Sequence, residues 1–515
     1  MPHATPHAGT RPASGAKPCA ASNRNIRGSA LRLSFSLLLL SVLGACSLMP
    51  VYRQPAAPVP ASWPTGPSYK EAAAGPRAAA EIGWQTFFID ARLQQVIAQA
   101  LANNRDLRVS ALNIEKARAQ YRIERSALVP ALAAGASASA ARTPADLSGI
   151  GSALTSRQVG VDLGTAAYEI DFFGRIASLS EAALQTYLGT QEARRAQQIS
   201  LIAEVASAYL TLAADQDRLR LARQTLTSQQ ISFDLADRRL AAGAASGLDV
   251  ADARTSVETA RADVASYTSQ VALDLNALTL VAGGTVEDRL LPAGPVEGIL
   301  TLSNLPAGLP SDLLLRRPDV LEAKRSLRAA NADIGAARAA FYPGISLTAS
   351  AGTASSTLGG LFKGSSGAWS FVPQITLPIF DGGYNRANLA VAGTMRDIAV
   401  AQYEKSIQVA FREVADALAQ RGTIDERLAA QAALTDAAAK SYRIRQGRYK
   451  AGSDTYLNAL ISQRTLYSAQ QGLITIRLAN STNLVTLYKV LGGGVEPAGA
   501  PVAMNQPQRL PEGRQ

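Results

Sequence analysis

The chain has 515 residues, 47% of them hydrophobic and 18% charged, with a formal net charge of +11. Five basic and no acidic side chains lie in residues 1–45, which leaves 46 basic against 40 acidic side chains in the remainder. An excess this small and scattered argues against a nucleic-acid-binding protein. The hydrophobic fraction argues against a disordered chain.

Few residues remain that could support catalysis. His3 and His7 are the only histidines, and both lie with Cys19 in the first 45 residues, which leaves Cys46 as the other cysteine. If that leader is removed, a Cys/His zinc site, a Ser-His-Asp triad and a Cys-His pair are all excluded. A carboxylate-dependent enzyme stays as the last-ranked alternative, since no paired carboxylates or glycine-rich phosphate loop stand out. The sequence predicts no enzyme, no metal site and no cofactor.

The leader has the organisation of a signal peptide. Arg24, Arg27 and Arg32 precede an apolar run over 33–45, which is too short to span a bilayer, because a spanning helix takes about 20 residues. The run ends Leu43-Gly44-Ala45-Cys46, which resembles the bacterial lipobox. The resemblance implies diacylglycerol and a second acyl chain on Cys46, which together give stable anchoring. Ser47 after it implies sorting to the outer membrane. The alternative is a leader that is not lipidated.

After Cys46 the chain predicts an extended tether, then a helix and two strands. The tether is rich in proline. A helical stretch over 91–128 ends before Pro130, because proline lacks an N–H and disfavours helix in the residue before it. Apolar residues alternate with polar or small ones over 158–163, and more weakly over 132–140. Alternation over about 9–11 residues fits transmembrane strands with one face to lipid and one to a lumen. A soluble hairpin is the alternative.

A helix of unusual length follows. No proline occurs between Pro144 and Pro292, and the sequence predicts a helix over 175–241, roughly 100 Å long at about 1.5 Å per residue. A strict seven-residue spacing of apolar residues indicates coiled-coil contact with neighbouring helices. A fibrous or cytoplasmic coiled coil is the alternative, but it leaves the strands unexplained. The spaced residues are Val205, Leu212, Leu219, Leu226, Phe233 and Leu240.

The second half of the chain repeats the first. Residues 168–284 align without a gap on residues 209 positions later, and the block before them aligns at an offset of 213. The second copy therefore predicts a helix over 312–342, strands near 345–352 and 369–377 and another long helix pair. Matching residues include Glu204 with Glu413, Ala242-Gly243 with Ala451-Gly452, Leu248 with Leu457, Asp106 with Asp319, and Pro130 with Pro343.

These patterns predict an α+β membrane protein with an internal two-fold repeat. The predicted divisions are a lipoprotein signal peptide over 1–45, a proline-rich lipidated tether over 46–80, a first repeat over 81–284, a linker over 285–308, a second repeat over 309–494 and a disordered tail over 495–515.

Several motifs resemble those of the TolC-like outer membrane factors, in the OprM/CusC (NodT-like) branch of outer-membrane efflux lipoproteins. The resemblance covers residues 43–494. The Arg-Pro-Asp motif is interpreted mainly as a structural helix start, because proline favours the first turn and aspartate its positive end. The motifs are Arg316-Arg317-Pro318-Asp319, Ala339-Ala340-Phe341-Tyr342-Pro343, Leu377-Pro378-Ile379-Phe380-Asp381-Gly382-Gly383 and Arg448-Tyr449-Lys450-Ala451-Gly452.

The resemblance implies a trimer in which each protomer gives four strands to one 12-stranded transmembrane β-barrel that continues into a long α-helical coiled-coil periplasmic barrel. Physical chemistry supports closure between copies. Hydrocarbon cannot satisfy the open edges of a four-stranded sheet, and the smallest such barrels have eight strands. The number three comes from the family.

The implied activity is passive conduction of small molecules in a tripartite efflux system. The implied partners are two further copies of this chain, a periplasmic adaptor (membrane fusion) protein, an inner-membrane RND transporter and outer-membrane lipid, with no nucleic acid. The implied location is the outer membrane, lipid-anchored and extending into the periplasm. Two alternatives stay open: an exit duct for protein secretion with an ABC exporter, and a coiled-coil lipoprotein without a pore.

The tips of the two helix pairs are the implied entrance, docking surface and gate. Leu457 stands at the family's leucine constriction, and Ile461 stands where related drug-efflux members place an aspartate ring. Asp249 or Asp454 could supply charge instead, or pair with Arg448 to latch the tips. The glycines also suit helix ends. The full set of candidate residues is Gly243, Leu248, Asp249, Arg448, Tyr449, Gly452, Asp454, Leu457 and Ile461.

Overall fold

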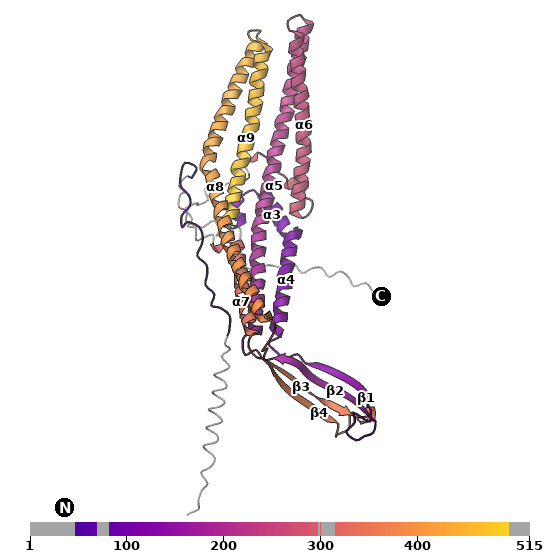
Figure 1. Cartoon of the computed structure of the whole chain (residues 1–515). Helices are drawn as coiled ribbons and strands as arrows, with labels where there is room; N and C mark the ends of the chain where they lie inside the picture. The colour runs from indigo at the N-terminus through magenta and orange to yellow at the C-terminus, as the bar shows by residue number, and fades with distance from the viewer. Residues whose placement is uncertain (1–46, 70–81, 297–298, 300–314, 494–515) are drawn as a thin grey trace, which may run out of the picture.

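A computed structural model describes residues 47–69, 82–296, 299 and 315–493. The predicted signal peptide, Cys46, part of the linker and the predicted tail lie outside these residues. The described part is elongated, with a bundle of long helices at one end and a small sheet at the other (Figure 1). None of its helices is both long enough and apolar enough to span a membrane.

The elements of the first half recur in the second. The helices that precede the strands have 22 residues in both halves, and the long helices that follow the strands have 67 in both. In chain order the first half holds α2 (Trp84–Phe87), α3 (Ala91–Asn103), α4 (Arg105–Ser126), β1 (Ala133–Thr143), β2 (Leu154–Glu169), α5 (Arg175–Ala241), α6 (Gly247–Ala282) and η2 (Asp288–Leu290); the second holds α7 (Pro318–Ala339), β3 (Gly344–Ser355), η5 (Leu358–Gly360), β4 (Gly367–Thr376), α8 (Tyr384–Lys450) and α9 (Tyr456–Val490).

The prediction of one helix over 91–128 is wrong, because the helix breaks at Asn104. This residue has an extended backbone, with φ −61° and ψ 130°, and its side chain accepts a hydrogen bond from the Leu107 N–H. The same side chain donates to the Val281 carbonyl at 3.0 Å. Asn104 therefore caps α4 and ties it to the end of α6, and the chain turns between α3 and α4.

The helix predicted over 312–342 begins later than expected. Residues 312–314 lie outside the described part, and α7 starts at Pro318 after an extended Arg317, with φ −62° and ψ 138°. Proline is favoured in the first turn of a helix because its missing N–H has no partner there. The helix ends at Ala339, four residues before Pro343, as the proline predicted.

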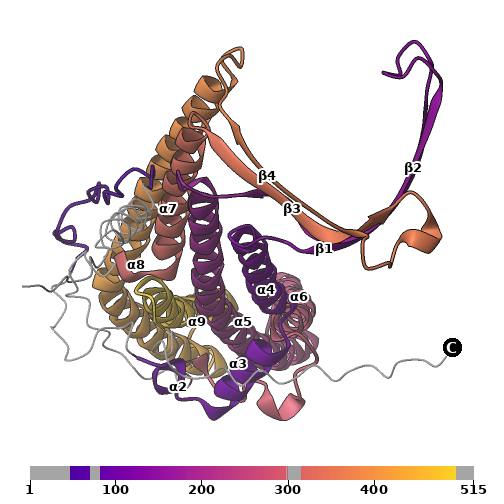
Figure 2. The same ribbon diagram turned by 90° about the horizontal axis from the view of Figure 1, so that it is seen from below.

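The four predicted strands form one antiparallel sheet in the order β1-β2-β3-β4. Val159 of β2 pairs with Ser355 of β3, so the middle of the sheet joins the two halves of the chain. β2 is longer than predicted, at 16 residues, and carries an irregularity between Thr165 and Tyr168. The sheet curves away from the helices, and β1 and β4 are its edges (Figure 2).

The helices pack in the same order as the strands that they join. At the sheet end the contacts run α4-α5-α7-α8, and at the opposite end they run α6-α5-α9-α8. The seven-residue seam of α5 is buried at Val205 and Leu212, but Leu240 near the tip is 40% exposed. The seam therefore lies inside the protomer only along its first part.

The main core lies midway along the bundle, where short α2 and α3 cover the long helices. Phe87 stacks on Tyr488 with ring centroids 4.0 Å apart. The buried Tyr488 and Tyr209 hydroxyls donate to the carbonyls of Ile82 and Leu290 at 2.5 and 3.0 Å. These bonds satisfy polar groups that would otherwise be costly to bury.

The proline-rich segment after residue 46 lies against α7 and α8, and we call residues 47–63 the strap. Its Trp63 stacks on Phe411 of α8, with centroids 4.9 Å apart. Its main chain is held by α7, because Asn331 donates to the Pro50 carbonyl at 2.8 Å. Further contacts are Arg338 to the Leu48 carbonyl, Arg328 over the Tyr52 ring, and Gln54 to the Tyr403 hydroxyl.

Candidate functional site

The two predicted tips have the same backbone. Gly243 follows α5 with φ +71°, and Gly452 follows α8 with φ +73°, a left-handed conformation that favours glycine. In the first tip the Ala244 N–H donates to the Arg239 carbonyl at 2.7 Å, and in the second Ser453 donates to Arg448 at 2.9 Å. Both glycines thus end a helix, as the sequence predicted.

The acidic residues of the tips accept hydrogen bonds at the start of the helix that follows each tip. Asp249 accepts from the Ser246 N–H at 3.0 Å, while the Ser246 hydroxyl accepts from the Asp249 N–H. Asp454 accepts from the Asn458 side chain at 2.7 Å and from the Thr455 N–H at 2.8 Å. The bond from Asn458 is the main reason that the pKa of Asp454 is lowered.

Arg448 stays within its own tip. Its Nε lies 3.7 Å from an Asp454 carboxylate oxygen, and its side chain is 60% exposed. Asp249, the other predicted partner of Arg448, is engaged by Ser246 in this chain. A partly exposed pair at this distance contributes little free energy. The pair joins Arg448 to its own helix turn and does not connect the two helix pairs.

Arg239 connects the tips, and sequence reasoning missed it. It extends from α5 over the ring of Tyr449, 4.5 Å from the centroid, and donates to the carbonyls of Tyr449 and Lys450 at 3.2 Å. Tyr449 is buried with Tyr456, and the cluster they form includes residues of both helix pairs. The repeat could have indicated a role for Arg239, because Arg239 is equivalent to Arg448.

The predicted apolar positions face outward. Leu248 is 69% exposed, and Leu457 and Ile461 are each 53% exposed. Leu457 and Ile461 are four residues apart on α9 and so lie on one face. The residue equivalent to Ile461 in the first tip is Asp252. The second tip therefore presents an apolar surface where the first carries a carboxylate.

The sheet has one apolar and one polar face, and both are solvent-exposed in the single chain. The register places Leu163, Ala351 and Trp369 in one row across β2, β3 and β4. Trp369 is 80% exposed and Phe371 on the same face 59%. The opposite face is lined by small and polar residues, namely Gly135, Ser137, Ser139, Ser156, Gln158, Gly160, Asp162, Ser346, Ser350, Ser370 and Gln374.

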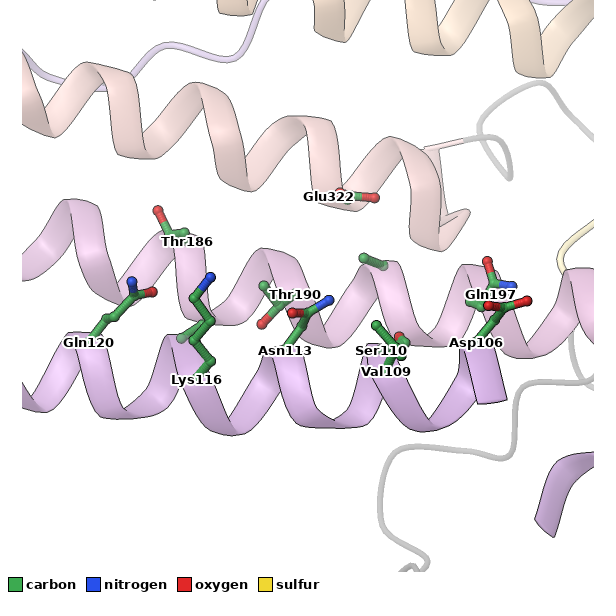
Figure 3. A pocket seen from close by; sticks show the side chains of 12 residues that line it. Asp106, Val109, Ser110, Asn113, Lys116, Gln120, Thr186, Thr190, Gln197 and Glu322 are labelled. Carbon is green, nitrogen blue, oxygen red and sulfur yellow. The ribbon is translucent and has the colours of Figure 1, made fainter. Parts of the chain in front are cut away.

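A polar groove runs between α4 and α5 on the side of the bundle (Figure 3). Its volume is about 610 Å³. The groove holds no metal cluster, since the described part of the chain contains no group of three or more His, Cys, Asp or Glu side chains suited to an ion. Most of the side chains that line it repeat every three or four residues along the two helices: Asp106, Val109, Ser110, Asn113, Lys116, Ala117 and Gln120 of α4, and Thr186, Thr190, Ala193 and Gln197 of α5, with Glu322 of α7 completing the lining.

Comparisons with known proteins give one consistent answer. The profile described as "Outer membrane efflux protein" matches residues 96–284 and again 309–493. The chain is 50% identical to the toluene efflux pump outer membrane protein TtgC of Pseudomonas putida, over 89% of this chain and 96% of that protein. It is 46% identical to outer membrane protein OprJ of Pseudomonas aeruginosa, over 89% and 95%.

Solved structures agree with the sequence relatives. A membrane protein from Pseudomonas aeruginosa superposes with a TM-score of 0.81 at 45% identity, covering 87% of this chain and all of that one. The MtrE outer membrane channel of Neisseria gonorrhoeae, crystallised in its open state, gives 0.79 at 39% identity, covering 87% and 98%.

Proposed function

This chain belongs to the outer membrane efflux protein family, and from that premise we propose that it is the outer-membrane channel of a tripartite efflux system. In this proposal it conducts small molecules passively, while an inner-membrane RND transporter supplies the energy and a periplasmic adaptor joins the two. Relatives named for toluene, solvent and antibiotic efflux favour small organic substrates over secreted proteins.

The observation that carries the proposal is the four-stranded sheet with two unpaired edges and one exposed apolar face. Such a sheet cannot lie in hydrocarbon alone, because each unpaired backbone group there costs several kcal/mol. Three copies placing β1 against β4 of the next copy would close a 12-stranded barrel. The polar faces would then line the lumen and the apolar faces would meet lipid.

The internal repeat supplies a template for contacts between copies. Inside the chain α5 packs against α7, and Arg325 donates to Gln185 at 3.2 Å. In a trimer the equivalent contact would join α8 of one copy to α4 of the next, where Thr394 replaces Gln185 and Leu112 replaces Arg325. Leu112 and Ile398 are 54% and 47% exposed in the single chain and would bury each other there.

The α8 helix carries an exposed stripe that suits this role. Tyr384, Val391, Met395 and Ile398 lie at spacings of seven, four and three residues and are all about half exposed or more. Such a stripe is the coiled-coil type of seam. In the trimer it would lie over α4, beside the groove of Figure 3. The groove is then a seat for a neighbouring helix and not a catalytic cleft.

We propose that Cys46 carries the lipid. The strap begins one residue later, and Arg338 holds the Leu48 carbonyl near the end of α7, where β3 starts. The acyl chains would therefore enter the membrane beside the base of the barrel.

The tips are the proposed gate and docking surface. Arg239 bridges the two helix pairs of one copy. By analogy through the repeat, Arg448 would bridge to the next copy in the same way. Leu457 and Ile461 would form apolar rings at the entrance, which resist wetting when the tips are closed. No acidic ring is expected at Ile461.

Two measurements on the purified, detergent-solubilised protein test the proposal. Native mass spectrometry should give a trimer with no stable monomer, since unpaired strand edges are costly. Planar-bilayer recordings should show channels, with conductance that rises when the tips are destabilised. A stable monomer whose strand amides are protected from exchange, or a trimer that never conducts, would refute it.

A further inference from the structure

Two arginines lie on the apolar face of the sheet, at its end farthest from the helices. Arg142 is next to the last residue of β1, and Arg157 is in the first part of β2. The connection between these strands is the far end of the hairpin, because α4 precedes β1 and α5 follows β2 (Figure 1). Both side chains are exposed.

The register places the two arginines on neighbouring positions of the sheet. Arg157 pairs with Ala140 and Arg142 pairs with Thr155, so the arginines are diagonal neighbours on one face. Diagonal Cα atoms in an antiparallel pair lie roughly 7–8 Å apart, a distance that long side chains span easily.

This face is the apolar one. Along β2, Arg157 is followed on the same side by Val159, Val161 and Leu163, and the row of Leu163 continues to Trp369. Arg157 lies six residues beyond Leu163, or about 20 Å along the strand. The arginines thus lie above an apolar band and an aromatic side chain, as polar groups do at the edge of a membrane.

Among the residues that the structure describes, no carboxylate forms an ion pair with either arginine. None of the ion pairs found among the described residues involves Arg142 or Arg157. Asp162 lies on the opposite face, and Asp146 in the connecting loop pairs with neither arginine. Two adjacent positive charges facing outward above an apolar band fit an anion that belongs to the surrounding membrane.

We propose that Arg142 and Arg157 together bind the phosphate groups of lipid headgroups in the outer leaflet, the phosphorylated glycolipids of bacterial outer membranes. The inference rests on the proposed function, which places this end of the sheet outermost. Guanidinium groups bind phosphate by paired, charge-assisted hydrogen bonds, and two of them can hold one phosphate or two neighbouring ones. The lipid would brace the β1–β2 hairpin, which extends past the β3–β4 pairing.

The test compares the full-length trimer with the variant Arg142→Gln/Arg157→Gln. Native mass spectrometry and co-purification are measured with diphosphorylated lipid A, monophosphorylated lipid A and dephosphorylated lipid A as the added probes. Wild type should retain lipid A in the order of its phosphate content. The double variant should retain the diphosphorylated form about 10-fold less for each arginine lost.

The matched control is Arg254→Gln/Arg443→Gln, which removes the same charge from exposed helix positions at the opposite end. It should retain lipid A like wild type. Equal retention by wild type and Arg142→Gln/Arg157→Gln would overturn the inference, as would wild-type retention of the dephosphorylated form. Displacement of lipid A by millimolar inorganic phosphate would show that the two arginines bind free phosphate and not a lipid headgroup.

Conductance of the same preparations separates this inference from the proposed function. A conducting, trimeric double variant that has lost lipid A supports the inference. A conducting trimer that retains lipid A refutes the inference alone. If wild type itself forms no conducting trimer, the proposed function fails and the inference fails with it.

Discussion

Arg317 and Asn104, 213 residues apart and equivalent in the repeat, donate to the carbonyls that end the two helix pairs. Arg317 Nη1 lies 3.0 Å from the Val490 oxygen, and Asn104 Nδ2 lies 3.0 Å from the Val281 oxygen. Two chemically different side chains thus make the same connection, from the start of the helix before each strand hairpin to the end of the helix pair after it.

Arg317→Ala should destabilise the second half of the chain. The side chain is 11% exposed and also binds Asp319 and Glu413 at 2.7 and 2.8 Å. Arg317 is nearly buried, but the side chains of Asp319 and Glu413 are 40% and 36% exposed and stay partly solvated when it is removed. The loss therefore costs about 1–2 kcal/mol, less than for a fully buried cluster. Thermal unfolding followed by circular dichroism should show a clearly lower Tm than that of the wild type. Arg316→Ala, next to it but exposed, should leave unfolding unchanged; equal losses in both would contradict this account.

Gly335→Ala should release the strap. A Cβ at this position would lie 2.5 Å from Met49 Cγ, 2.6 Å from Ser178 Oγ and 3.0 Å from Met49 Cα, so Met49 would have to shift away from α7. Limited proteolysis of residues 47–63 and the fluorescence of Trp63 would report the release. In Gly393→Ala the new methyl group meets nothing within 4 Å. That control should stabilise its helix by about 1 kcal/mol and keep the strap protected.

The raised pKa of Asp274 predicts that the stability of the fold depends on pH. Burial is the main cause that raises its pKa from 3.8 to about 6, followed by a hydrogen bond to the nearby Asp215, which is itself paired with Arg218. A raised pKa in the folded state means that the neutral carboxyl favours folding. Asp274 therefore contributes its full stabilisation of the fold below pH 3.8, and this stabilisation is lost as the pH rises through about 6.

Asp274→Asn should remove this dependence. Urea unfolding measured between pH 4.5 and 7.5 should show wild type losing stability relative to the variant as pH rises. The second repeat has Asn483 at the equivalent position, so the substitution suits the fold. Exposed Asp436→Asn should track wild type. A constant difference between wild type and Asp274→Asn across this range would count against the raised pKa.

Arg239→Ala should open the tips. Its loss removes the ring contact and both carbonyl bonds that join the two helix pairs. Single-channel conductance without partner proteins should exceed wild type, and adding Leu457→Ala should raise the conductance further by widening the proposed apolar ring. Arg448→Ala tests the equivalent bridge between copies. The control is Arg238→Ala, because Arg238 is exposed. If all three variants conduct like this control, the tips have a docking role only.

Cys46→Ser should abolish acylation. Without the thiol there is no acceptor for diacylglycerol, and the leader should stay uncut or be cut elsewhere. Mass spectrometry of the mature N-terminus would decide the matter: an unmodified terminus at another residue in the wild-type protein would show that Cys46 is not the anchor.

The sequence predicted those parts of the fold that depend on local pattern. The strands were visible because one face of each is apolar, as at Trp369 and Phe371. The long helix over 175–241 was visible because no proline interrupts it. The break at Asn104 was missed because good helix-forming sequence lies on both sides, and the bond that fixes the turn reaches Val281, 177 residues away.

The tip was predicted less completely, for a similar reason. Glycine conformations and helix starts depend on neighbouring residues, so Gly243 and Gly452 behave as expected. Arg239 gains its role from carbonyls 210 and 211 residues later, which no local pattern reveals. The sequence motif indicated Arg448 instead, which in the single chain contacts only its own tip.

The pairing of Val159 with Ser355 also constrains the order of folding. Each hairpin can form as soon as its own two strands exist, but β2 and β3 are separated by the whole first helix pair. Contacts between distant segments are slow to form, because the loop between them must first be closed. The edge of β2 that faces β3 therefore stays open until the segment between the two strands has been closed into a loop. In the folded chain α7 packs against α5, and the helix bundle thereby holds the two hairpins side by side.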